Sequence, residues 1–527
     1  MAETRSTLRP LPTPAARIRA RGDVVPAGGL LALRNRAETP AEALATDLGF
    51  LADALEGAGV EVMLVRDDQD RPILVVDEAD RVAAQRALVI ACAGEPFYAQ
   101  PLKRNLSQRG GPVLLADGEL SGNRDDRLLS IFRPRLDVAG TLHADSAVRF
   151  EFWATSGSEV RVPAPNALTR RRFARDDMEP AEVERYGRTW RTMRGMFTDL
   201  VSEVTFDIDM VFSWVDGTDK EWQRARARRM ASYVVGEGDD SEARYRQIDE
   251  LRYALRSVYT YLPWVRRIYI ATDSPAPAWL RDHPRVRIVR SEEFFTDPSV
   301  LPTHNSQGVE AQLHRIPGLS EHFIYSNDDM FIGRPLRPEV FFSPGGVSRF
   351  IEASTRIGIG ENDSQRSGFE NAARVNRRLL QDRFGRVITR HLEHSATPLR
   401  KSVIEELERE FPDEFAATAA SPFRAADNIS VTNSLYHYYA LLTGRAVQNT
   451  EARVLYVDTT TRKGLALMKK LLKKRSWDFF CLNDGSFPEV PPEERARKVR
   501  SFLRRYFPIA APWETTAADV TPTAAAG

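Results

Sequence analysis

Short apolar runs in the second half of the chain end in acidic residues. Three of them have the length and composition of buried strands: Ile208–Phe212 ahead of Asp216, Ile268–Ala271 ahead of Asp273, and Phe323–Tyr325 ahead of Asp328 and Asp329. Ligands bind outside the carboxyl ends of the strands in an open α/β sheet. We therefore expect these acids to gather at one edge of a sheet, where they would hold a cation and the phosphate that the cation clamps.

Apolar residues at helical spacing separate these runs. Ile248–Tyr261 is typical of an amphipathic helix, and a strand at Val286–Val289 and a helix at Val309–Ile316 precede the third acidic strand end. Further helical patterns follow over residues 371–384, 398–411, 427–442 and 463–475. The order predicts an α/β domain over residues 206–513, with a mostly parallel sheet and a helical C-terminal part.

The first part of the chain shows simpler patterns. Helix, strand, strand and helix follow one another from residue 41 to 91, and alternating runs such as Val148–Trp153 come next. Residues 39–165 thus predict a small α/β module and a β region, and they contain no catalytic constellation. By composition we interpret residues 1–38 as a flexible arm, 166–205 as a charged helical connector and 514–527 as a disordered tail.

Charge and cysteine content exclude several classes of protein. Seventy-four Lys and Arg residues against 73 Asp and Glu give a net charge of +1, so the chain has no overall field for nucleic acid. The isolated Cys92 and Cys481 argue against a disulfide framework and a Cys-based zinc site. No signal peptide or membrane-spanning apolar run is visible. We expect a cytoplasmic protein whose contact with the membrane, if any, is peripheral and at its inner face; the oligomeric state stays open.

The acids favour a shared metal site over three separate turns. A single Asp at a strand end commonly caps a helix or shapes a turn. Three such strand ends together favour a shared metal site at Asp216, Asp328 and Asp329. The hard oxygen atoms of these residues suit Mg²⁺ or Mn²⁺. Asp273 stays open, because Ser274-Pro275 follows it and an Asp there can simply shape the turn.

His394 is the candidate general base. It stands ahead of the helix predicted from Pro398, whose polar face carries Arg400 and Lys401. An imidazole there would accept a proton near neutral pH beside cations that hold phosphate. His391 is a rival within the same short segment, so both histidines stay candidates.

Further polar residues surround these candidates. Arg252 and Arg424 have guanidinium groups that suit paired phosphate oxygens, although most arginines are solvated or salt-bridged. Glu310 and His314 share one face at helical spacing, either as part of the site or as structure. The basic amphipathic segment Lys463–Arg475 has a solvated face as its simplest interpretation, and contact with an anionic polymer or lipid headgroups as the alternative.

Five ordered motifs resemble the four regions of the Stealth proteins. These are bacterial sugar-phosphate transferases of capsule and exopolysaccharide synthesis, similar to the animal N-acetylglucosamine-1-phosphotransferase catalytic subunit. The motifs are Asp209–Gly217, Glu250–Ser257 with Pro263–Val265, Phe323–Phe331, His394–Leu407 with Arg424, and Cys481–Gly485. The resemblance covers residues 206 to 510 and leaves the first 200 residues unexplained.

The resemblance implies roles for individual residues. It puts Asp216, Asp328 and Asp329 at a donor and metal site, with Mg²⁺ or Mn²⁺ as cofactor, and assigns catalysis to His394, Asp328 and Arg424. The residues implied to bind substrate are Trp214, Asp216, Arg252, Glu310, His314, Asn327, Lys401, Asn483 and Asp484. The family often has a proline two residues after its histidine, whereas Ser395-Ala396-Thr397 separates His394 from Pro398 here.

The implied activity is the transfer of hexose-1-phosphate from a nucleotide sugar to a glycan hydroxyl, with release of a nucleoside monophosphate. The product would be a phosphodiester of a capsular polysaccharide or exopolysaccharide. A metal-dependent glycosyltransferase that releases a nucleoside diphosphate is the alternative, and a non-catalytic glycan-binding scaffold is a third interpretation. The intact His394, Arg424 and aspartate pair speak against a scaffold, which has no need of them. The sugar, the nucleotide and the acceptor stay open.

Overall fold

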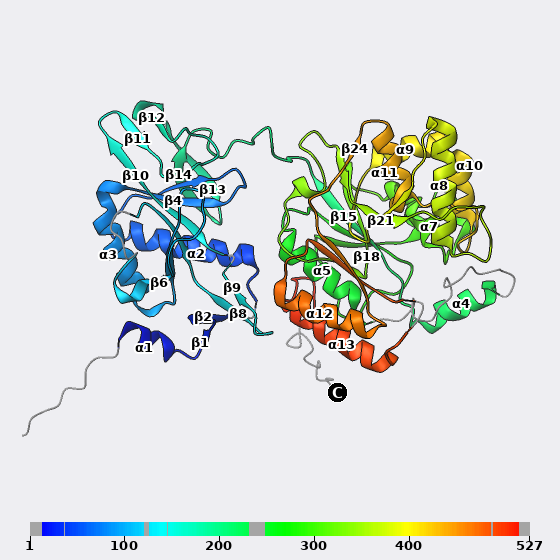
Figure 1. The fold of residues 1–527 in the computed structure, drawn as a ribbon, viewed down its shortest axis with the longest axis horizontal. Coiled ribbons are helices and arrows are strands. Elements are labelled where there is room, and N and C mark those ends of the chain that lie inside the picture. Colours follow the sequence, from blue (N-terminus) through cyan, green and yellow to red (C-terminus); the bar gives the residue numbers. More distant parts are fainter. Residues whose placement is uncertain are drawn as a thin grey trace, which may run out of the picture. The chain divides into compact units, whose positions relative to one another are not determined.

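The computed structural model describes residues 13–35, 37–120, 126–144, 146–230, 248–485 and 488–515. The chain divides into two compact units, Met1–Asp199 and Leu200–Gly527 (Figure 1). The boundary falls within the stretch that we interpreted as a connector. Each unit has its own hydrophobic core.

A mixed β-sheet forms the centre of the first unit. β10 (Val148–Ser156) pairs in parallel with β4 (Pro72–Asp77) and antiparallel with β7 (Leu128–Phe132). The helices α2 (Pro40–Glu56) and α3 (Arg81–Ala91) supply apolar side chains to its core. The sheet also contains β3 (Met63–Arg66), β5 (Tyr98–Pro101), β6 (Val113–Leu114), β11 (Glu159–Arg161) and β12 (Arg172–Ala174). The predicted α/β module and β region therefore share one sheet.

The flexible-arm interpretation of residues 1–38 is wrong for residues 13–35. This segment forms a helix and two strands that join a small separate sheet: α1 (Pro14–Arg19), β1 (Val24–Ala27) and β2 (Leu30–Asn35), with β8 (Arg135–Asp137) and β9 (Leu142–His143). Ile18, Val24 and Leu31 are buried in one apolar cluster. Few apolar residues are thus enough to order a stretch rich in Arg and Pro. Residues 1–12 lie outside the described part of the chain.

The helical interpretation of residues 166–205 is also wrong. β13 (Pro180–Arg185) and β14 (Arg188–Met193) form an antiparallel hairpin. Tyr186 and Gly187 turn the chain with φ values of 52° and 76°, and two positive φ angles suit a two-residue hairpin turn. Buried and exposed residues alternate along β14 around Trp190, a pattern typical of a strand. This pattern prevails over the helical spacing of the apolar residues that follow Trp190.

The main sheet of the second unit is mostly parallel, as predicted. Its order is β17 (Val286–Val289), β16 (Ile268–Ala271), β15 (Ile208–Ser213), β18 (His322–Asn327) and β23 (Thr397–Arg400). The first four of these strands are parallel to one another, and β23 is an antiparallel edge strand. Met210 and Phe212 of β15 belong to one core and Val211 to the other, so both faces of the sheet are buried.

A second sheet joins the first at a two-residue turn. β19 (Met330–Ile332) begins directly after Asp328-Asp329 and pairs antiparallel with β26 (Phe479–Asn483), which pairs in parallel with β25 (Val454–Asp458). The sheet brings the C-terminal part of the chain to the third acidic strand end.

Several predicted helices are present with changed ends. α5 (Glu250–Tyr261), α8 (Gly368–Phe384) and α12 (Arg462–Lys474) form as expected. The helix predicted from Pro398 begins only with α9 (Lys401–Glu410), because Thr397 precedes a proline and such residues prefer extended backbone. Two other predicted helices break up, into α7 (Ser306–Glu310) with a 3₁₀ turn at Leu313–Arg315, and into a π-helical turn at Val431–Leu435 with α11 (Tyr436–Leu442).

The remaining elements complete the second unit. They are α4 (Lys220–Met230), α6 (Ser291–Phe294), α10 (Pro412–Ala420), α13 (Pro492–Tyr506), β20 (Ser348–Phe350), β21 (Glu352–Arg356), β22 (Arg390–Leu392) and β24 (Ala446–Gln448). The disordered-tail interpretation is wrong at Glu514, whose side chain is buried between Arg252 and Arg256; residues 516–527 lie outside the described part. No helix among the described residues is long and apolar enough to cross a bilayer.

Candidate active site

Asp328 and Asp329 occupy the turn between the two sheets. Because β18 ends at Asn327 and β19 begins at Met330, both aspartates lie at the carboxyl edge of the parallel strands, as the sequence pattern predicts. The backbone N–H of Leu482 in β26 donates to the carbonyl oxygen of Asp329 at 2.9 Å. Contacts from both sheets therefore fix the turn.

The two carboxylates are partly shielded from water and repel each other. Loss of hydration raises the pKa of Asp328 well above its usual range, and the negative charges of Asp329 and Glu250 raise it further. Loss of hydration also raises the pKa of Asp329, against the opposing effect of His394. Carboxylates in such surroundings are stabilised by a bound cation or a proton.

The Asp329 carboxylate has one oxygen with partners and one without. Oδ2 accepts from the Asn483 amide at 3.3 Å and from the Cys481 thiol at 3.4 Å. Oδ1 is inaccessible to solvent and has no hydrogen-bond partner among the described residues. Because an unsatisfied buried acceptor costs about 1–3 kcal/mol, this oxygen is poised to bind a ligand.

Glu250 belongs to the same cluster, although the sequence marks it only as part of a helix start. It opens α5, is 7% exposed and accepts from the backbone N–H of Ile248 at 2.5 Å. Burial raises the pKa of Glu250 to about 7, and the negative charge of Asp484 adds to the shift. The signal that was missed is its position, in the first turn of the helix that follows the first acidic strand end.

His394 lies beside Asp329. It stands in the turn between β22 and β23, and Thr397 of β23 pairs with Tyr325 near the carboxyl end of β18. The imidazole centroid is 5.2 Å from that of the Tyr456 ring in β25. Burial lowers the pKa of His394, and the Asp329 carboxylate opposes that shift. The imidazole is thus neutral near neutral pH, with a carboxylate beside it to stabilise the charged form.

The expected position of His394 at a helix N-terminus is wrong, because β23 separates it from α9. His391, the rival base, is buried and stacks on Phe369 with ring centroids 4.6 Å apart. Its Nε2 lies 3.7 Å from Oε1 of Glu370. These contacts of His391 lie with residues of α8, and neither is with Asp328 or Asp329.

A polar network lies at the ends of β15 and β18. The hydroxyl of Tyr325 has three neighbours within hydrogen-bond distance: Ser213 Oγ at 2.7 Å, Asn327 Oδ1 at 2.9 Å and Glu310 Oε1 at 3.2 Å. Thr432 donates to the other oxygen of Glu310 at 2.6 Å. Glu310 and Asn327, both predicted to bind substrate, are therefore joined through a tyrosine that the sequence marks only as part of a strand.

Arg424 approaches this network from a loop. Its Nη2 donates to the hydroxyl of Ser306 at 2.8 Å, and its positive charge opposes the burial that raises the pKa of Glu310. A Cβ atom on Gly368 would lie 2.6 Å from the Arg424 Cβ, so glycine at residue 368 permits the close approach. Arg424 thus lies near Glu310, in the network at the ends of β15 and β18.

Asp484 follows β26 and pairs with Arg495 of α13. Thr459 donates to Oδ1 of Asp484 at 3.1 Å, and Arg495 donates to Thr459 at 2.7 Å. A Cβ atom on Gly485 would lie 2.1 Å from the Asp458 carboxylate, so glycine at residue 485 permits this close approach. Arg495 and Asp458 are site neighbours that sequence reasoning missed, because Arg495 is one of many cations in its helix and Asp458 resembles a helix cap.

Four family models match the chain in order. They are Stealth protein CR1, conserved region 1, at residues 206–234, CR2, conserved region 2, at 244–350, CR3, conserved region 3, at 393–441, and CR4, conserved region 4, at 469–525. Exopolysaccharide phosphotransferase CpsY of Mycobacterium leprae (strain TN) is 57% identical over 94% of this chain and 91% of its own length. The chain belongs to the Stealth family of exopolysaccharide phosphotransferases.

Other relatives resemble the chain over most of its length. Exopolysaccharide phosphotransferase of Nocardia farcinica (strain IFM 10152) is 53% identical over 90% of this chain and 88% of its own length. Among solved structures, the galactosyltransferase LgtC in complex with donor and acceptor sugar analogues covers 57% of this chain and 96% of its own, at 10% identity and a TM-score of 0.29. The coverage of the Stealth relatives includes most of the first unit, which the four family models do not reach.

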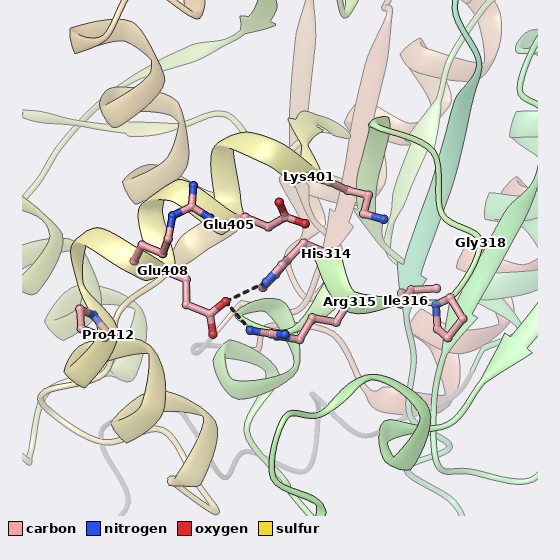
Figure 2. A pocket seen from close by; sticks show the side chains of 10 residues that line it. His314, Arg315, Ile316, Gly318, Lys401, Glu405, Glu408 and Pro412 are labelled. Carbon is pink, nitrogen blue, oxygen red and sulfur yellow. Dashed lines mark hydrogen bonds and ion pairs between the residues drawn. The ribbon is translucent and has the colours of Figure 1, made fainter.

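Lys401 and His314 do not join the aspartates of this Stealth protein. Because β23 runs antiparallel to β18, its last residue lies at the amino end of β18. Lys401 and His314 line a cavity of about 680 Å³ there, where the Nε2 of His314 lies 3.0 Å from Oε2 of Glu408 (Figure 2). These two expected substrate ligands thus lie at the edge of the sheet opposite Asp328.

Other expected ligands have partners within the protein. Arg252 pairs with Glu514 at 2.6 Å, Trp214 is buried in the core, Asp216 accepts from Thr218 at 2.9 Å, and Asp273 accepts from Ser291 at 2.8 Å. The turn-shaping role that an isolated strand-end Asp commonly has therefore applies to Asp216 and Asp273. For Arg252 the structure shows a salt bridge, the common alternative for an arginine.

The structure does not assemble the expected triad of metal ligands. No group of three or more His, Cys, Asp or Glu side chains in the described part of the chain is arranged to hold a metal ion. Asp216 is engaged in its own turn. Asp328 and Asp329 nevertheless fit a cation, because they are adjacent hard ligands and Oδ1 of Asp329 has no other partner among the described residues.

Proposed function

We propose that this Stealth protein transfers hexose-1-phosphate from a nucleotide sugar to a hydroxyl of a glycan in exopolysaccharide or capsule synthesis. The acceptor oxygen attacks the phosphorus atom that carries the sugar. A phosphodiester bond forms, the bond from that phosphorus to the bridging oxygen of the pyrophosphate breaks, and a nucleoside monophosphate leaves. The acceptor proton goes to His394.

The observation that carries the proposal is the electrostatic interaction between His394 and Asp329, each of which shifts the pKa of the other. A neutral imidazole accepts a proton, and a neighbouring carboxylate stabilises the imidazolium that results. Burial lowers the pKa of His394, which keeps the imidazole free to accept the proton near neutral pH. The names of the Stealth relatives, exopolysaccharide phosphotransferases, support a phosphoryl group as the group transferred.

Arg424 and the polar network at the ends of β15 and β18 orient the phosphate group of the donor. A guanidinium suits paired phosphate oxygens, and Arg424 lies beside Glu310, which Tyr325 and Thr432 hold in place. Asn327 accepts hydrogen bonds in the same network. We assign phosphate orientation to Arg424, and support of that residue to Glu310.

A divalent cation, Mg²⁺ or Mn²⁺, is part of the proposal, with Asp328 and Asp329 as its protein ligands. The support is the pair of adjacent, mutually repelling carboxylates and the solvent-inaccessible Oδ1 of Asp329, which has no partner among the described residues. When bound, such an ion neutralises charge on phosphate oxygens. A cytoplasmic location follows from the proposed donor, because nucleotide sugars are made inside the cell.

The decisive experiment identifies the released nucleotide. The purified protein is incubated with a panel of nucleotide sugars, an oligosaccharide acceptor and Mg²⁺, with the His394→Ala variant as the matched control. Release of nucleoside monophosphate together with a phosphodiester signal in the phosphorus NMR spectrum of the product supports the proposal. A nucleoside diphosphate and a product without phosphorus would instead establish the glycosyltransferase alternative.

A further inference from the structure

Exposed cations are concentrated on two neighbouring helices of the second unit. α12 exposes Arg462, Lys463, Lys469, Lys470, Lys473 and Lys474, and α13 exposes Arg497, Lys498, Arg500, Arg504 and Arg505. The same helices carry two carboxylates, Glu493 and Glu494. Eleven cations against two acids leave nine excess positive charges, in a chain whose net charge is only +1. We name these eleven residues the basic face.

The two helices present this face on one side of the unit. The apolar residues Leu465 and Met468 of α12 and Val499 and Leu503 of α13 pack into the same hydrophobic cluster. The cations of each helix lie on the side away from those apolar residues. α12 and α13 run next to each other on the outside of the unit (Figure 1). Their polar sides therefore form one continuous surface.

The basic face is available to a partner. Within the described part of the chain, Lys498 is the one member of the face whose side chain forms an ion pair, with Glu494 at 2.6 Å. The aromatic residues of α13, Phe502 and Tyr506, are buried. Recognition of single-stranded nucleic acid relies on exposed aromatic rings on which bases stack, and the face offers none among its residues. Clustered Lys and Arg without apolar side chains match a surface of anionic headgroups.

We propose that the basic face docks this protein onto an anionic lipid surface by electrostatic attraction. α12 begins directly after Thr461, and the preceding turn contains Thr459, which donates to Asp484 of the candidate active site. Docking through α12 would thus hold the site close to the membrane plane. The attraction is reversible and weakens with salt, because no apolar side chain of the face enters the bilayer.

Vesicle binding of the full-length protein tests the proposal. We expect sedimentation with vesicles of phosphatidylcholine and phosphatidylglycerol, release from them at high salt, and no sedimentation with phosphatidylcholine alone. Each cation at such a surface contributes about fivefold to the partition coefficient. The triple variant K469Q/K470Q/K473Q should therefore bind about a hundredfold more weakly, whereas K469R/K470R/K473R should bind as the unchanged protein does.

A second triple variant controls for total charge. R378Q/R386Q/R409Q also removes three exposed cations from the second unit, none of them in an ion pair within the described part or on the basic face, and should bind normally. Thermal melting followed by circular dichroism checks that every variant is folded. Two results would overturn the proposal: equal loss of binding in both Gln variants, or binding of soluble dextran sulfate without binding of anionic vesicles.

Discussion

Carboxylates with limited exposure to solvent occur in both units, but their surroundings differ. In the first unit Asp47 is fully buried and pairs with Arg133 and Arg135, each at 2.7 Å. In the second unit no Lys or Arg among the described residues pairs with Asp328 or Asp329, and one oxygen of Asp329 has no partner there. The first arrangement is complete within the protein, whereas the second leaves charge to be neutralised by something else.

The difference separates a structural use of buried charge from a functional one. Breaking a complete buried ion pair leaves an uncompensated charge and destabilises the fold. A cluster of like charges destabilises the fold while it is empty, and it gains free energy when a cation, a proton or a substrate arrives. Stability and activity should therefore respond in opposite ways to mutation at the two places.

The largest expected effect comes from the aspartates themselves. Asp47→Ala should lower the free energy of unfolding of the first unit by about 3–5 kcal/mol, because it removes the fully buried carboxylate that Arg133 and Arg135 share and leaves them only their more exposed partners, Glu95 and Glu38. Asp329→Asn should leave stability unchanged or higher, yet lower turnover by about a hundredfold or more. Urea titration and turnover measured on the same two variants test the contrast. A large loss of stability in Asp329→Asn would show that the second cluster is structural as well.

The pH dependence of stability sharpens the comparison. Because the folded-state pKa of Glu250 is raised to about 7 from 4.5, the folded protein holds a proton that the unfolded chain has lost between these values. That contribution is fully present below about pH 4.5 and is lost as the pH rises through about 7, at a cost of at most about 3 kcal/mol. The shift of Asp328 has the same sign.

Glu250→Gln should therefore melt higher than the unchanged protein at mildly alkaline pH and show a flatter pH profile. Addition of Mg²⁺ should raise the melting temperature of the unchanged protein most at alkaline pH, where the carboxylates are charged. Thermal melting across this pH range is the measurement. An identical profile in the variant would remove Glu250 from the cluster.

The next largest effect, a loss of turnover, is expected from substitution of His394, with His391 as the comparison. His394→Ala should lower turnover by about a hundredfold or more, the usual span for loss of a general base. His391→Ala should change it by less than about tenfold, because His391 contacts Phe369 and Glu370 instead of Asp329. Turnover at saturating donor is measured for both variants. A larger loss in His391→Ala would transfer the role of base to that residue.

The smallest effect is expected at the opposite edge of the sheet. Lys401→Ala should change turnover by less than about twofold, since Lys401 lies at the amino end of β18. His314→Ala should likewise leave turnover near normal, once any loss of folded protein is measured by circular dichroism. A tenfold loss of turnover in folded Lys401→Ala would mean that the cavity beside Glu408 takes part in the reaction.

Sequence reasoning succeeded where chemistry follows from local pattern. Apolar runs that end in acids predicted β15, β16 and β18 and the position of Asp328 and Asp329, because parallel strands share one carboxyl edge. Sequence reasoning failed where the direction of a strand determines at which edge of the sheet a residue lies. Lys401 was expected beside His394, but β23 is extended and antiparallel, so it carries the chain from one edge of the sheet to the other.

Ion pairs between side chains far apart in the chain also could not be predicted from the sequence. Nothing local distinguishes Arg495 from the other cations of α13, or Arg252 from an arginine that binds phosphate, until Asp484 and Glu514 are placed beside them. The family resemblance implied that Asn483 and Asp484 lie near the site. The physical cause is the pairing of β26 with β19, which brings Cys481 to Asp329, 152 positions away in the chain.

The junction at Asp328-Asp329 has a consequence for the order in which the protein matures during synthesis. A growing chain that has reached residue 450 already contains both aspartates, His394 and Arg424, but it lacks β25, β26 and α13. Until these emerge, β19 has no partner strand and Asp329 has neither Asn483 nor Cys481 beside it. The turn that carries both aspartates therefore gains its full set of contacts late in translation, and a chain released early would hold Asp328, Asp329 and His394 beside an incomplete second sheet.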